Sequence, residues 1–163
     1  MRFFGLIWLL SAGIALAQGA SVPFSGLQHD TSLPVEITAD ALDLNQTNGT
    51  ALFEGNVIAG QGPLRLAAPL VEVTYAQDGG TIDLIEARGG VTLTNGIEAA
   101  EAKSALYQVA KGEVLMEGDV LLTQGPNALA GDTLRINLDS GLATMEGRVR
   151  TILQPGSAAG STQ

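Results

Sequence analysis

The sequence predicts an all-β fold built from a repeated antiparallel unit. Three observations support this prediction: apolar and polar residues alternate along most of the chain, turn-forming pairs separate the alternating runs, and one short motif recurs around a glycine. Alternation with a period of two places one set of side chains on an apolar face and the other set in water. The clearest alternating runs are residues 35–40, 42–44, 71–75 and 134–139.

Turn-forming pairs fall between these runs. Such pairs supply the positive φ angles that tight hairpins require. Residues 99–109 are the only stretch that resembles a helix, and the alternation at its end favours a strand instead. The turn pairs are Asn48-Gly49, Asp78-Gly79, Asn95-Gly96, Lys111-Gly112 and Ser140-Gly141.

A motif of the form apolar-Glu-Gly-x-Val recurs at residues 53–57, 116–120 and 145–149, with a weaker copy at 87–91. A glycine inside a strand usually marks a bulge or a sharp bend. Bends at the same point of every unit predict a sheet that curves around an interior, as in a jelly roll or a V-shaped β-solenoid. The repeated glycines are Gly55, Gly89, Gly118 and Gly147.

An open sheet of this kind has two edges that lack a neighbouring strand. Only Pro34 and the region of Pro155 blunt these edges, so strand addition by another chain is expected. The alternative is that the segments before and after the sheet cover its edges.

The N-terminal residues 1–17 resemble a secretory signal peptide. Arg2 supplies a positive start, residues 3–10 and 14–16 are apolar, and Ala15-Leu16-Ala17 is a small-x-small cleavage pattern. The segment is short for a membrane span of roughly 20 residues, although an uncleaved anchor is the alternative. We expect cleavage after Ala17 and export to the periplasm. The rest of the chain divides into a flexible leader at 18–32, a β domain at 33–153 and a disordered tail at 154–163.

No catalytic or metal-binding equipment is evident in the sequence. The sole histidine, His29, lies in the polar leader and is expected to be solvated, and the chain has no cysteine for zinc sites or thiol chemistry. Glu54, Glu117 and Glu146 recur beside the bend glycines, where a calcium site or a glycosidase pair is conceivable. Their position opposite the apolar residues favours solvent-facing side chains instead. We therefore expect no enzyme activity, no metal and no cofactor.

The charge and the apolar residues narrow the classes of partner. Loss of Arg2 with the signal moves the formal net charge from −9 to −10, which argues against nucleic acid. The exported part is rich in aliphatic residues and poor in aromatic ones. Aliphatic side chains lining a curved sheet would leave a groove for acyl chains or would pack a closed core, and the pattern alone leaves both open.

Several segments of the β domain resemble the OstA-like family, which includes the LptA-like bridge proteins of lipopolysaccharide transport. The order and spacing of the segments carry the resemblance, since each is short and made of common residues. The resemblance covers residues 33–153 almost throughout, in the segments 33–45, 51–62, 68–74, 102–113 and 131–137.

This resemblance implies an open, twisted β-jelly roll of repeated antiparallel hairpin units whose interior binds the lipid A acyl chains of lipopolysaccharide. It implies a carrier that passes lipopolysaccharide from the inner-membrane transporter to the outer-membrane translocon. The implied partners are the jelly-roll domains of those components, joined by edge-to-edge strand pairing, and further copies of the chain in a head-to-tail homo-oligomer. A membrane-anchored jelly-roll component of the same transport line and a ligand-free structural repeat protein of the cell envelope are the alternatives.

The resemblance also implies which side chains line the lipid. Acyl chains would be held by burial, at about 25 cal/mol per Å² of apolar surface, while the charged head group stays in solvent. The positions expected from the family are Val35, Ile37, Leu93, Tyr107 and Val109. Alternation alone adds Leu42, Leu44, Leu134, Ile136 and Leu138.

Overall fold

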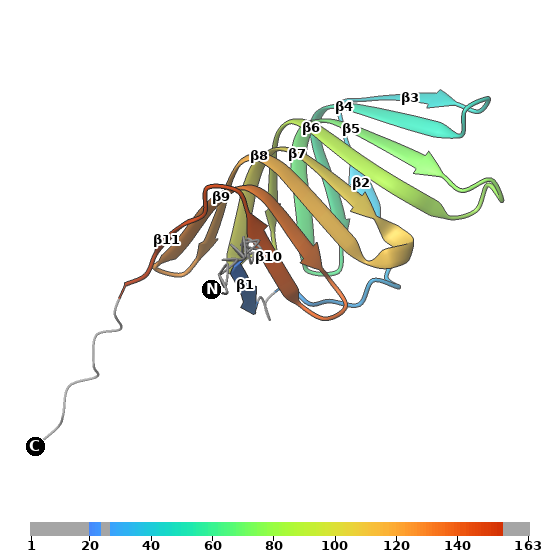
Figure 1. The fold of residues 1–163 in the computed structure, drawn as a ribbon. Coiled ribbons are helices and arrows are strands. Elements are labelled where there is room, and N and C mark those ends of the chain that lie inside the picture. Colours follow the sequence, from blue (N-terminus) through green and yellow to red (C-terminus); the bar gives the residue numbers. More distant parts are fainter. Residues whose placement is uncertain (1–19, 24–26, 155–163) are drawn as a thin grey trace, which may run out of the picture.

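A computed structural model describes residues 20–23 and 27–154 of the chain. Within these residues eleven strands form one antiparallel sheet (Figure 1). The strands are β1 (Ala20–Pro23), β2 (Glu36–Thr38), β3 (Ala41–Asn45), β4 (Thr50–Gln61), β5 (Leu64–Tyr75), β6 (Ile82–Thr94), β7 (Glu98–Gln108), β8 (Glu113–Gln124), β9 (Asn127–Asn137), β10 (Leu142–Glu146) and β11 (Arg150–Ile152). A short 3₁₀ turn, η1 (Val109–Lys111), joins β7 to β8.

Hairpins join the successive strands from β4 to β10, and the sheet does not close on itself. At one end β2 and β3 pair with the two halves of β4, and at the other end β11 and β10 pair with the two halves of β9. The predicted all-β fold with an open, curved sheet is therefore confirmed. Residues 99–109, for which a helix was the alternative, lie almost wholly in β7 and confirm the strand interpretation.

Each repeat glycine lies at a sharp bend, and the residue after it also has a positive φ. Two such residues in succession interrupt the ladder and turn the strand, and the pairing register shifts at the first three bends. Figure 1 shows the bent ribbons lying side by side. The four pairs are Gly55-Asn56 (φ 77° and 46°), Gly89-Gly90 (92° and 98°), Gly118-Asp119 (87° and 48°) and Gly147-Arg148 (75° and 45°).

Side chains of the neighbouring strand lie against the bends. In three of the four, this side chain also pairs with the residue that follows the glycine. These pairs are exposed, and exposed ion pairs contribute roughly 0–1 kcal/mol, so the backbone conformation and not the pairing sets the bend. The pairs are Asn56 with Asp40 (2.8 Å), Lys103 with Asp119 (2.6 Å) and Arg148 with Asp132 (2.5 Å).

The bends divide the sheet into two arms that share one core. The first arm holds the strand halves next to the turns at 45–50, 75–82, 108–113 and 137–142, and the second holds those next to the turns at 61–64, 94–98 and 124–127. Buried side chains on the inner faces form rows in register across the strands. One first-arm row is Ala51, Val73, Ile85, Tyr107, Val114, Ile136 and Ala143. One second-arm row is Ala59, Leu66, Leu93, Ala100, Leu122 and Leu129.

The described part of the leader differs from the expectation of a flexible segment. β1 pairs with β10 and lies beside it in Figure 1. Leu27 is 1% exposed and belongs to the core. His29, expected to be solvated, is half-buried, and its backbone N–H donates to the Leu138 carbonyl at 3.3 Å. These contacts join residues about 110 positions apart, so no local pattern signals them.

The predicted signal peptide and cleavage site lie outside the described residues, as do residues 155–163 of the predicted tail. Over the described ranges, no helix has both the length and the apolar character needed to cross a membrane.

Gly89→Ala is expected to destabilise the fold more than Gly90→Ala. Both positions have a φ near +90°, so alanine costs about 1–3 kcal/mol of backbone strain at either one. A Cβ at position 89 would also lie 2.6 Å from Pro69 Cγ, whereas at position 90 nothing lies within 4 Å. Urea unfolding of the two variants measures the difference. Equal losses would show that packing against Pro69 does not constrain the bend.

Candidate functional site

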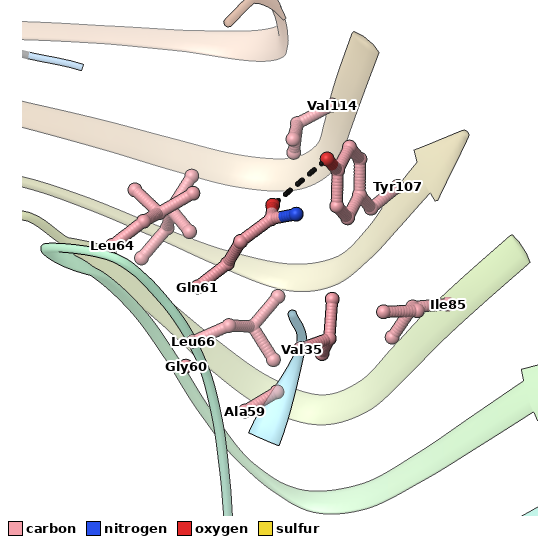
Figure 2. Close-up of a pocket in the computed structure, with 10 residues that line it drawn as sticks. Val35, Ala59, Gly60, Gln61, Leu64, Leu66, Ile85, Tyr107 and Val114 are labelled. Atoms are coloured by element: carbon pink, nitrogen blue, oxygen red, sulfur yellow. Dashed lines mark hydrogen bonds between the residues drawn. The ribbon is translucent and has the colours of Figure 1, made fainter. Parts of the chain in front are cut away.

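A small apolar cavity lies between the two arms, inside the curve of the sheet (Figure 2). Its lining comes from both arms: Val35, Leu64, Leu66 and Leu93 on one side, and Ile85, Tyr107 and Val114 on the other. The cavity measures about 30 Å³, which is room for about two water molecules. Sites that bury drug-sized ligands measure about 300–1,000 Å³. The interior is therefore almost filled by the protein's own side chains.

Gln61 joins the two arms at the edge of this cavity. Its side chain is buried at the end of β4, and its Oε1 accepts a hydrogen bond from the Tyr107 hydroxyl at 3.0 Å (Figure 2). His29 Nε2 lies 3.1 Å from the same oxygen. Gln61 Nε2 donates to the carbonyls of Thr31 and Leu33, both at 2.8 Å. Both polar atoms of the amide are thus satisfied inside an apolar surrounding, as buried polar groups require.

Residues 27–33 form a strap between the tips of the two arms. At the second arm the strap is held by Gln61. At the first arm Gln28 Nε2 donates to the Asp139 carbonyl at 2.7 Å, and the Thr31 hydroxyl donates to Asp139 Oδ1 at 3.0 Å. Because Leu27 at its start is buried in the core, the strap covers part of the opening between the arms.

The electrostatics of the interior are simple. Burial raises the pKa of the Tyr107 hydroxyl, the nearby Asp139 carboxylate raises it further, and the hydrogen bond to Gln61 opposes both. Within residues 20–23 and 27–154, no three His, Cys, Asp or Glu side chains are grouped closely enough to hold a metal ion. Glu54, Glu117 and Glu146 are exposed, which confirms that they face solvent.

Comparison with known proteins identifies the family. The profile of the family described as LptA/(LptD N-terminal domain) LPS transport protein matches residues 36–142. The chain belongs to this family. The resemblance predicted from the sequence is thereby confirmed, and the family is one of transport proteins, not of enzymes.

Two individual proteins are similar to this member of the LptA/LptD N-terminal family. An uncharacterized protein of Rhizobium meliloti (strain 1021) is 33% identical over 121 residues, which cover 70% of this chain and 65% of that protein. The chain therefore spans about two thirds of the length of this relative. LptH of Pseudomonas aeruginosa, described as the LptA-homologous periplasmic component of the lipopolysaccharide transport device, has a similar crystal structure. Its TM-score is 0.69 at 17% identity, covering 77% of this chain and 99% of LptH, which supports the jelly-roll fold.

Most of the residues predicted to line lipid lie in or against the shared core of this LptA-like fold. Val35, Ile37 and Val109 are partly buried and pack against the core. Leu42 and Leu44 instead lie on the edge strand β3 and are 49% and 65% exposed. They pair with Phe53 and Ala51, so they extend the inner rows to the open end of the sheet. The fully buried members are Leu93, Tyr107, Leu134, Ile136 and Leu138.

Sequence reasoning missed several side chains that line the cavity, among them Ala59, Gln61, Leu66 and Ile85. Alternation within β4 and β5 places Ala59 and Leu66 on the inner face and could have identified them. Gln61 also occupies an inward position of β4, but its polar character concealed it. The contact of any of these residues with lipid remains a prediction.

Tyr107 is expected to ionise at higher pH than a free tyrosine. Its raised folded-state pKa means that the fold favours the neutral phenol, so this stabilisation is complete below pH about 10 and is lost as the pH rises through the folded pKa. The free energy of unfolding should fall at alkaline pH in the natural chain and fall less in Tyr107→Phe. Denaturant unfolding between about pH 8 and 11 measures both slopes. Equal slopes would contradict this assignment.

Proposed function

We propose that this chain is a periplasmic carrier, exported by cleavage after Ala17, that binds the acyl chains of lipopolysaccharide between its two arms. The observation that carries the proposal is the set of aliphatic rows running across the whole inner face of a transport-family fold. The carrier passes lipopolysaccharide from the inner-membrane transporter to the outer-membrane translocon. The net charge stays compatible with an anionic lipid because the charged head group remains in solvent.

Binding requires the arms to separate. A cavity of about 30 Å³ cannot hold an acyl chain, so the chain must replace contacts that the arms now make with each other. The exchange is of apolar contact for apolar contact, at about 25 cal/mol per Å² on both sides of the balance. Arms that close over an interior without lipid also avoid a large exposed apolar patch, which would favour aggregation.

The inner rows support a continuous path from one jelly roll to the next. Leu42 and Leu44 extend these rows to the exposed edge formed by β2 and β3, and Ile152 of β11 is 56% exposed at the opposite end. Edge strands accept further strands by main-chain hydrogen bonding. We infer that these edges join the chain to the jelly-roll domains of the inner-membrane and outer-membrane components, and to further copies head to tail.

β1 adds a condition to the pairing of the C-terminal edge. It already occupies the free side of β10, in a register that runs from Ala20 opposite Met145 to Pro23 opposite Leu142. A strand of the next jelly roll must therefore pair with β1 itself or replace it.

A photo-crosslinking residue at Leu93 is expected to capture lipopolysaccharide, whereas the same residue at Thr92 is not. The two positions are adjacent on β6 and face opposite sides of the sheet, with Leu93 1% exposed on the inner face. Irradiation of the purified chain with lipopolysaccharide, followed by immunoblotting for the lipid, measures capture. Equal capture at both positions, or none at Leu93, would contradict binding between the arms.

Leu44→Glu is expected to weaken association between copies of the chain without lowering its melting temperature. Leu44 is 65% exposed on an edge strand, so a charge there opposes strand addition but leaves the core intact. Leu121→Glu is the control, because Leu121 is 39% exposed in the middle of the sheet. Light scattering over a range of concentrations measures the mass. A similar loss of association in both variants would argue against pairing at this edge.

A further inference from the structure

Glu98, the first residue of β7, carries a buried oxygen with no hydrogen-bond partner. Its side chain is 4% exposed, and its Oε1 accepts a hydrogen bond from Gln124 Nε2 on β8. Oε2 is the one buried side-chain oxygen or nitrogen in the described part of the chain that has no partner. A buried polar atom without a partner costs about 1–3 kcal/mol, and proteins rarely retain one without a function.

The turn before β7 holds Glu98 in this position. Asn95 Oδ1 accepts hydrogen bonds from the backbone N–H groups of Ile97 and Glu98, at 2.9 and 2.8 Å. The Thr94 hydroxyl donates to the Glu98 carbonyl at 2.7 Å. These bonds fix the backbone at Glu98, and the alternation of β7 then directs its side chain inward. The inward position is thus built into the turn.

Glu98 lies where the apolar interior ends. It shares the inner face of β7 with Ala100 and Ala102, and Ala100 stands in the second-arm row beside Leu93. One step outward, at the tip of the same turn, Ile97 is 84% exposed. Glu98 therefore marks the boundary between the interior proposed for acyl chains and the solvent. Gln61 also lies at the tip of this arm, but both of its polar atoms are engaged.

We propose that Glu98 Oε2 accepts a hydrogen bond from a hydroxyl or amide N–H group of the bound glycolipid, at the junction of its acyl chains and its sugar. This inference rests on the proposed function. Acyl chains lying along the second-arm row bring that junction to the tip of the arm. There the donor of the lipid satisfies the oxygen that the protein leaves without a partner.

The same contact selects among lipids. A carboxyl oxygen that already accepts from Gln124 offers only an acceptor to the ligand. Acylated amino sugars present N–H and O–H donors beside their acyl chains. Diacyl phospholipids present ester oxygens there, which are acceptors and leave Oε2 without a partner. Glu98 is thus a specificity-determining residue that favours the glycolipid over phospholipids with acyl chains of similar length.

The test uses the purified chain and its Glu98→Gln variant, with Glu101→Gln as the control. Glu101 lies on the same strand and is exposed on the outer face. A fluorescent fatty acid is bound first and is then displaced by lipid A or by phosphatidylglycerol. Glu98→Gln should weaken lipid A binding by about fivefold or more, because the new amide presents a donor to a donor. Its affinity for the fatty acid and for phosphatidylglycerol should stay within about twofold, as should all three affinities of Glu101→Gln.

The outcomes separate this inference from the proposed function. Equal lipid A binding by the natural chain and Glu98→Gln would overturn the role of Glu98 and leave the carrier function standing. A uniform loss of affinity for all three lipids, together with a lower melting temperature, would show that Glu98 is structural and would also overturn the inference. If none of the three lipids binds the natural chain, both proposals fail.

Discussion

The bend at the repeat glycines is the constraint on which the rest of the structure depends. At each bend two successive residues have positive φ angles, and the strand turns between its two halves. Because the bends occur at the same level in every repeat, the strand halves align into two arms, and their inner faces meet in one core. A flat sheet with the same apolar alternation would have one exposed apolar face. The bend converts this face into an interior.

That interior suits a carrier because its contacts are apolar and nearly non-directional. Its rows consist mostly of Ala, Val, Leu and Ile, and β7 contributes Ala100, Ala102 and Ala105. Hydrogen bonds are concentrated at the opening between the arms, where Gln61 links Tyr107 to the strap. Acyl chains can replace aliphatic contacts along the rows without breaking a buried polar network, while the polar residues at the tips recognise what lies beyond the acyl chains.

The sequence allowed the fold and much of the interior to be predicted, because alternation and repeated glycines are local signals. It did not reveal the strap, whose contacts to Leu138 and Asp139 cross about 110 positions of the chain. Alternation also placed Leu42 and Leu44 on the inner face, but periodicity does not tell whether that face is covered. Glu98 and Gln61 occupy inward positions of their strands, yet polar residues at such positions do not stand out against an apolar pattern.

Separation of the arms on lipid binding can be measured directly by the distance between two spin labels. Arg65 on the second arm and Asp83 on the first are exposed, and the chain has no natural cysteine, so Arg65→Cys with Asp83→Cys gives one label on each arm. Electron–electron resonance measurements before and after addition of lipopolysaccharide should show a distance that lengthens and saturates with lipid. A distance that stays constant while lipopolysaccharide demonstrably binds would contradict binding between the arms.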